Sequence, residues 1–124
     1  MSPSIDAKVW ESLVALEAAG EPGFLRELVA EFLAQAPQRM AALSDASTRA
    51  DAPALEREAH GFKGSCGSLG ATAMADCCER LETMGRDGSC ATAADVLRTL
   101  DREWQAVRGA LQDTLERSSG SASS

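Results

Sequence analysis

Apolar side chains recur along most of this chain at intervals of three and four residues, the spacing that gathers them on one face of an α-helix. The pattern predicts five helices, over about residues 6–19, 24–47, 51–70, 71–84 and 92–115. Alternating runs rich in β-branched residues, which would predict strands, are not found. Helices of this length joined by short turns indicate an all-α fold. We expect an antiparallel four-helix bundle with an additional N-terminal helix as a lid.

Each predicted helix carries an apolar stripe that we expect to face the core. In the first helix Asp6 is placed to act as the N-cap, and the stripe comprises Val9, Leu13 and Leu16. The second has the broadest stripe, made of Leu25, Leu28, Val29, Phe32, Leu33, Ala36, Met40 and Leu43. The fifth has Val96, Leu100, Trp104, Val107 and Leu111. Pro37 falls inside the second helix and should kink or divide it, because proline lacks the N–H that bonds back to Leu33.

The length of 124 residues corresponds to one domain. We expect the bundle to occupy residues 1–117 and the Ser-rich residues 118–124 to form a disordered tail. With 44% apolar residues, the chain can bury a core of ordinary size.

The net charge of the chain makes some classes of binding partner unfavourable. Nineteen acidic residues against 12 basic ones give a net charge of −7, which disfavours nucleic acid and acidic membrane surfaces. No apolar run is long enough to span a bilayer, and residues 1–6 lack the features of a signal peptide. We therefore expect a cytoplasmic protein. Its four cysteines are then better interpreted as free thiols than as two disulfides.

The single histidine lies beside a narrow apolar stripe in the third helix. That stripe has spacings of four, three, four and three residues and comprises Leu55, Ala59, Phe62, Cys66 and Leu69. His60 follows Ala59 directly, so at about 100° per residue it points away from the middle of this core face. We expect its side chain on the flank of the helix, within reach of solvent.

The neighbours of His60 on the helical wheel suggest chemistry. Gly64 lies one turn above it, although glycine inside a helix costs roughly 1 kcal/mol relative to alanine. Without a side chain there, the backbone of another protein can approach the imidazole closely. Lys63 supplies a positive charge for an anion attached to His60. Neutral imidazole is a competent nucleophile, but the chain has no phosphate-binding loop with which to use ATP directly.

The run from Ala59 to Ala71, AHGFKGSCGSLGA, resembles the motif of histidine-containing phosphotransfer (HPt) domains, A-H-x-L-K-G-S-[SA]-x-x-L-G-A. Met74 then stands at the family's usual leucine, and a C-x-x-L-E pattern follows with Cys78, Leu81 and Glu82. The helix pattern before and after the motif is also HPt-like. Two departures, Phe62 for leucine and Cys66 for a small residue, fall on the core side, away from His60.

The resemblance implies a histidine phosphotransfer protein of a two-component phosphorelay. His60 would carry a phosphoryl group on its outer ring nitrogen, to and from aspartates of response-regulator receiver domains. Lys63 would steady that group, and Gly64 would give the partner room. The partner-binding surface would comprise Glu56, Arg57, Gly61, Gly64, Ser65 and Gly67.

The resemblance also sets the expected cofactors and partners. The chain would be a phosphocarrier and not an enzyme with its own nucleotide site. It would need no cofactor of its own, because the receiver domain would supply Mg²⁺. A hybrid sensor histidine kinase would act upstream, and we expect a monomer.

Two other functions are possible from the sequence. One is a docking module with the same surface that moves no phosphate. The other is a metal or cofactor bundle, which normally needs inward Glu-x-x-His sets. Here only Glu56 and His60 approach one another, at a spacing of four residues, and there is no second histidine. The cysteines form no CxxC pair. We do not expect Glu79 and Glu82 to converge with the histidine, so no hydrolase site is predicted.

Overall fold

The structure, a computed structural model, describes residues 4–123, with side chains described through Glu116. Within that range there are helices and no strands, which confirms the all-α fold class. The helices are α1 (Ala7–Ala19), α2 (Phe24–Thr48), α3 (Ala52–Leu69), α4 (Thr72–Arg86) and α5 (Ala93–Ser123).

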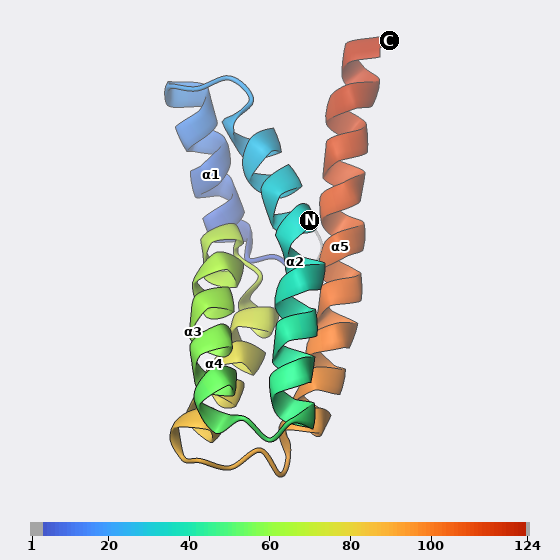
Figure 1. The fold of residues 1–124 in the computed structure, drawn as a ribbon. Coiled ribbons are helices and arrows are strands. Elements are labelled where there is room, and N and C mark those ends of the chain that lie inside the picture. The colour runs from blue at the N-terminus through green and yellow to red at the C-terminus, as the bar shows by residue number, and fades with distance from the viewer. Residues whose placement is uncertain (1–3, 124) are drawn as a thin grey trace.

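Four of the helices form a closed bundle in which α2 packs on α3, α3 on α4, α4 on α5 and α5 on α2. Figure 1 shows α2 and α5 running side by side along the molecule, with the shorter α3 and α4 beside one half of their length. The remaining helix, α1, continues beyond the end of α3 and contacts α2 and α3. The prediction of a four-helix bundle with an N-terminal lid is confirmed.

Local interactions explain where α1 begins and where α3 begins and ends. Asp6 caps α1 by accepting a hydrogen bond from the Val9 N–H at 3.0 Å, and Asp51 caps α3 through the Ala54 N–H at 3.1 Å. Gly70 ends α3 in the left-handed conformation, with φ at 81°. The Asp6 N–H donates to the Gly70 carbonyl at 2.7 Å, which fixes the start of α1 against the end of α3.

Of the two outcomes predicted for Pro37, a kink or a division of the helix, the division does not occur. The helix α2 runs from Phe24 to Thr48 with the proline inside it. The last helix also continues beyond the predicted end at Leu115, to Ser123. Ser124 and the side chains of residues 117–123 lie outside the described part of the structure, so the predicted disordered tail at 118–124 stays a prediction.

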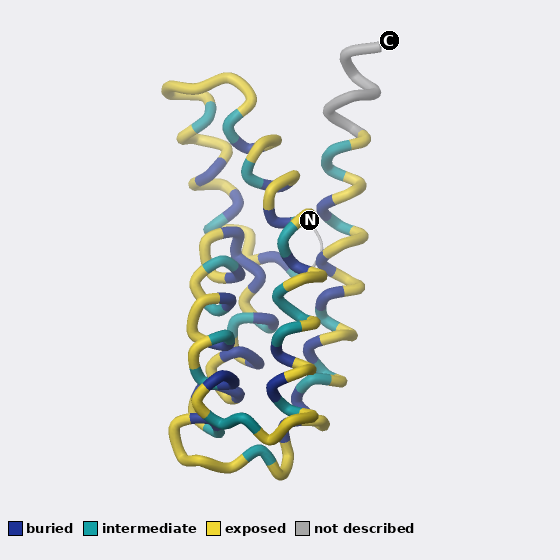
Figure 2. Tube along the Cα trace, viewed as in Figure 1, coloured by how far each residue is buried: buried dark blue, intermediate teal, exposed yellow. Residues whose placement is uncertain are grey.

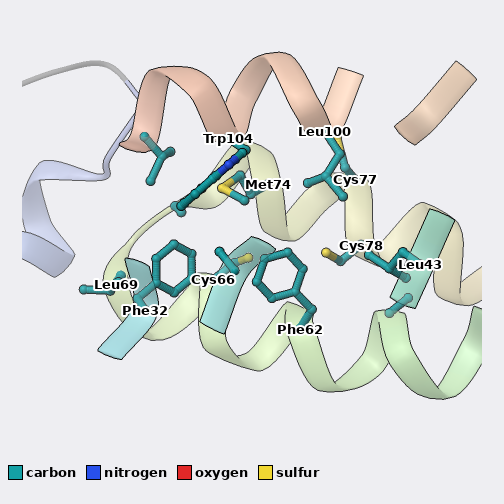
Figure 3. Close-up of a cluster of buried hydrophobic side chains, with 14 of the residues drawn as sticks. Phe32, Leu43, Phe62, Cys66, Leu69, Met74, Cys77, Cys78, Leu100 and Trp104 are labelled. Atoms are coloured by element: carbon teal, nitrogen blue, oxygen red, sulfur yellow. The ribbon is translucent and has the colours of Figure 1, made fainter. Parts of the chain in front are cut away.

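The core lies along the axis of the bundle (Figure 2) and is centred on stacked aromatic rings. The rings of Phe32 and Phe62 are 6.0 Å apart and stacked, and Trp104 meets Phe32 edge-on at the same separation. In Figure 3 these rings are surrounded by Leu69, Met74, Leu100 and the buried cysteines. The predicted stripes of α2, α3 and α5 all contribute to this core.

The stripe predicted for the first helix is only partly correct. Leu13 is buried and Val9 partly so, but the Leu16 side chain is 60% exposed and Trp10 is buried instead. The physical reason is that, among the described residues, α1 packs on α2 and α3 and on no other helix. The C-terminal end of α1 therefore has a buried face too narrow to include Leu16. Among the described residues, no helix is long and apolar enough to cross a membrane.

Candidate functional site

The rotation of α3 is set by its apolar stripe, and this rotation places His60 at the surface. All five stripe residues are at most 1% exposed, and Phe62 packs against Phe32 of α2. The His60 side chain, one position beyond Ala59, is 70% exposed. The position predicted from the helical wheel is confirmed.

A carboxylate from α4 holds His60 in place. Glu82 is the one charged residue that is buried among those described, with 8% of its side chain exposed. Its Oε2 lies 2.9 Å from His60 Nδ1, and its Oε1 accepts a hydrogen bond from Lys63 Nζ at 2.7 Å. One side chain of α4 thus links the histidine and the lysine, which are three residues apart on α3.

The hydrogen bond to Glu82 determines which nitrogen of His60 is nucleophilic. An ionised carboxylate can only accept, so Nδ1 must carry the proton that it donates to Glu82 Oε2. In the neutral ring, Nε2 then has the free lone pair. Because the side chain is mostly exposed, this second nitrogen is available to a reactant arriving from outside.

Charge pairing keeps Glu82 ionised. The hydrogen bond from Lys63 is the largest influence and, with that from His60, lowers the pKa of Glu82 below its usual value of 4.5, against the opposing effect of burial. The same bond raises the pKa of Lys63 above its usual value of 10.5. Around neutral pH the carboxylate is therefore negative and the lysine positive.

Arg86 extends the network along α4. Its Nη2 donates to Glu82 Oε2 at 3.1 Å, and its Nε donates to Glu56 Oε2 at 3.4 Å. Glu56 is thereby turned toward α4 and paired with an arginine. A shallow open hollow beside His60 is lined by Pro53, Glu56, Arg57 and Glu82.

The three glycines of α3 have different surroundings. A Cβ added at Gly64 or Gly67 would have no non-local heavy atom within 4 Å, so both glycines face open space. A Cβ at Gly61 would come 2.9 Å from the Arg39 Nη1 of α2. Ser65 lies at a hollow of about 150 Å³ between α2 and α3, whose floor includes Phe32 and Leu69. The space at Gly64 is open, and the approach of a partner there stays a prediction.

The cysteines have no place in this site. All four are free thiols, and Cys66, Cys77 and Cys78 are buried. A hydrogen bond with Cys78 and burial raise the pKa of the Cys66 thiol, and burial raises the pKa of the Cys77 thiol. Protonated, buried thiols are poor nucleophiles and metal ligands. Among the described residues, no three His, Cys, Asp or Glu side chains are grouped to hold a metal ion.

Sequence reasoning was wrong about Glu82, which does converge with the histidine, and it did not identify Arg86 as part of the site. A signal for Glu82 was present in the pattern of α4. The buried positions of this helix, Met74, Cys78, Leu81 and Gly85, follow helical spacing, and Glu82 falls within the same stripe. A glutamate on a core-facing stripe must find a partner, and His60 and Lys63 are the partners.

The family model for the Hpt domain matches residues 27–117, which is most of the chain. The chain therefore belongs to the Hpt domain family and is a histidine phosphotransfer protein of two-component phosphorelays. Members of this family work with receiver domains and kinases in phosphorelays.

The fold also matches a solved structure, that of histidine-containing phosphotransfer protein B (HptB) from Pseudomonas aeruginosa PAO1. The TM-score is 0.84 and the sequence identity 29%, over 94% of this chain and 98% of that one. No curated protein sequence matches the chain.

Proposed function

We propose that His60 is the phosphoacceptor, and that its Nε2 receives the phosphoryl group from the aspartate of a receiver domain and returns it to another. The observation that carries this proposal is the buried Glu82 carboxylate bonded to His60 Nδ1, which leaves Nε2 free in an exposed side chain. The chain has only this histidine, so a histidine phosphotransfer protein of this sequence has no other acceptor.

The chemical step is an in-line displacement at phosphorus. His60 Nε2 attacks, the bond between phosphorus and the aspartyl oxygen breaks, and the aspartate leaves as a carboxylate. The imidazole ring gains positive charge as the nitrogen–phosphorus bond forms, and the Glu82 carboxylate at 2.9 Å stabilises that charge. Lys63 lies beside the same carboxylate and supplies a cation for the transferred oxygens. In the reverse step an aspartate carboxylate attacks and the nitrogen–phosphorus bond breaks.

The remaining components belong to the partners. The receiver domain brings Mg²⁺, which neutralises charge on the transferred phosphoryl group. A hybrid sensor histidine kinase is the upstream source of phosphate, since the sequence contains no nucleotide-binding motif. We further propose that the protein acts as a monomer in the cytoplasm, as a phosphocarrier and not as an enzyme with its own nucleotide site.

The proposal is tested by incubating the protein with a radiolabelled phospho-receiver, with and without Mg²⁺. We expect Mg²⁺-dependent label on the protein that is labile in acid and stable in base, as a phosphohistidine is. If several receivers bind the protein but none labels it, the proposal fails and a docking module without transfer is the correct description.

Gly64→Leu should block transfer from a phospho-receiver, because the new side chain occupies the open space through which the partner approaches His60. We expect the rate to fall at least about tenfold, because a clash built into an interface disfavours the bound complex. Nothing in the bundle meets a Cβ at this position, and leaving glycine favours the helix by up to about 1 kcal/mol. Thermal unfolding should therefore show an unchanged or higher Tm.

Gly109→Leu is the matched control, since Gly109 lies in α5 and its added Cβ would also meet nothing within 4 Å. It should gain similar helix stability and transfer phosphate normally. Phosphoramidate, a small phosphodonor, should still label the Gly64→Leu variant, because it needs no docking surface. Normal transfer from the receiver to Gly64→Leu would contradict the proposed approach.

Glu82→Gln should lower the rate of phosphoryl transfer roughly ten- to a hundredfold, a loss typical of removing the charged partner that orients a functional histidine. The amide keeps the shape of the side chain and one accepting oxygen, but it cannot balance the charge that develops on the ring. Rapid-quench kinetics with a phospho-receiver measures this effect. A rate equal to wild type would show that the carboxylate contributes nothing to transfer.

The same variant should change the dependence of stability on pH. The pKa of Glu82 is lowered in the folded protein, so its ionisation stabilises the fold above the usual value of 4.5 and this contribution is lost as pH falls through the lower folded value. The free energy of unfolding, measured in urea between about pH 3 and pH 6, should therefore fall less steeply toward acid pH in Glu82→Gln than in wild type. Parallel curves would indicate that Glu82 is not charge-paired in solution.

A further inference from the structure

Several cations lie near His60. Lys63 and Arg86 both donate to the Glu82 carboxylate, and Arg86 also donates to Glu56. Arg57 lines the open hollow beside His60. A further cation, Arg39 of α2, approaches α3 at Gly61.

Arg39 lies against the backbone of α3 at Gly61. Its Nη1 is 2.9 Å from the point where a Cβ on Gly61 would stand, closer than real Cβ atoms normally tolerate. Gly61 is the residue that follows His60. Gly61 leaves room for the Arg39 guanidinium because it has no side chain, although a glycine weakens the helix.

The guanidinium of Arg39 has no bonding partner among the side chains described. Within residues 4–116 no hydrogen bond or ion pair involves it, whereas Arg49 pairs with Asp45 and Asp51, and Arg98 pairs with Asp95. An unpaired arginine that is partly buried in a chain with net charge −7 keeps all five of its N–H donors for a ligand from outside.

We propose that Arg39 docks the incoming receiver domain by binding one of its carboxylates beside the transfer site. This inference rests on the proposed function. A receiver presents a phosphorylated aspartate and oxygen ligands for Mg²⁺, so its contact surface is acidic, and this chain as a whole repels it. A guanidinium can bind a carboxylate through two parallel hydrogen bonds, which fixes orientation as well as register. Arg39 is a positioning residue that acts on the partner, while Lys63 serves the phosphoryl group.

The test compares two phosphodonors on Arg39→Gln. A receiver domain is first chosen from a panel by its binding to the wild-type protein in titration calorimetry. We expect Arg39→Gln to weaken that binding, and to slow transfer from the phosphorylated receiver, by roughly three- to tenfold at low ionic strength. Both differences should shrink toward twofold or less in about 0.5 M salt, where charges are screened. Labelling by phosphoramidate should be unchanged, because that donor makes no protein contact.

Three further variants separate docking from other roles. Arg102→Gln is the control and should bind and transfer like wild type. Arg102 is an exposed arginine of α5 whose one hydrogen bond among the described residues goes to Thr99. Arg39→Lys should recover part of the affinity, since it restores the charge without the bidentate geometry. Gly61→Ala should displace the guanidinium and slow transfer from the receiver, while helix stability is kept or improved.

Each outcome has a defined meaning. Unchanged binding and transfer in Arg39→Gln overturn the inference, as does a loss that does not depend on salt. An equal loss with phosphoramidate also overturns it, because Arg39 would then act on the phosphoryl group or the fold. If the receiver binds through Arg39 but never labels the wild-type protein, the proposed function fails and the docking inference stands. If no receiver in the panel binds, both fail.

Discussion

Replacing His60 by glutamine should abolish phosphoryl acceptance from every donor while leaving the bundle folded. His60 is the only histidine in the chain, so no second imidazole can take over its role. Radiolabel from a phospho-receiver and from phosphoramidate should both fall to background. We expect at least about a thousandfold reduction, because removing the nucleophile removes the reaction and not merely an interaction that assists it.

The fold should survive because the histidine side chain is 70% exposed and contributes little to the core. Glutamine can donate one hydrogen bond, and Glu82 keeps its bonds from Lys63 and Arg86, so no buried charge is left unpaired. Far-UV circular dichroism should be unchanged, and the free energy of unfolding should move by less than about 1 kcal/mol.

Binding of the receiver domain to the His60→Gln protein provides the control for this result. The His60→Gln protein should still bind the receiver that phosphorylates wild type, since the proposed contacts at Gly64 and Arg39 are intact. Retained binding with no label assigns the loss to chemistry. Acid-labile, base-stable label on the variant would place the phosphoacceptor elsewhere and refute the site.

The part of this site that belongs to a single helix could be predicted from the sequence. The spacing of Leu55, Ala59, Phe62 and Cys66 determines which face of α3 is buried, and that face determines where His60 points. The open space above Gly64 follows from the same wheel. These features depend on periodicity, which is a property of the chain alone.

The part that lies between helices could not be predicted in the same way. Glu82 and His60 are 22 residues apart, and their contact depends on how closely and at what height α4 packs against α3. The position of Arg39 over Gly61 depends likewise on the packing of α2. A helical wheel carries no information about how α4 or α2 packs against α3. The exposure of Leu16 arises for the same reason, because its helix has fewer neighbours than the stripe suggests.

The packing of α4 on α3 is set at Gly85. Substitution at this position is the second change for which we expect a large effect. A Cβ there would lie 2.5 Å from the Glu56 N and 2.7 Å from the Ala52 carbonyl oxygen. Both are backbone atoms of α3, so no rotation of a side chain can relieve the clash. The two helices touch at this point through their backbones, and only glycine allows such close contact.

Gly85→Ala should therefore destabilise the bundle, although alanine favours a helix. We expect the free energy of unfolding to fall by about 3 kcal/mol, the upper end of the cost of overpacking a rigid core site. For a domain of this size that lowers Tm by roughly 10 °C or more. Gly109→Ala, the same change at an open position of α5, should instead raise stability by up to about 1 kcal/mol. Urea unfolding of the two variants measures both effects.

The same displacement should damage the site. Glu82 lies one helical turn before Gly85 on α4, so moving α4 away from α3 lengthens the 2.9 Å contact with His60 Nδ1 and the 2.7 Å contact with Lys63. Phosphoryl transfer by the folded Gly85→Ala protein, measured well below its Tm, should therefore slow toward the rate of Glu82→Gln. In the double variant the two losses should not add, because both act by withdrawing one carboxylate. Additive losses, or a Gly85→Ala protein as stable and active as wild type, would show that the close approach of the two helices does not position Glu82.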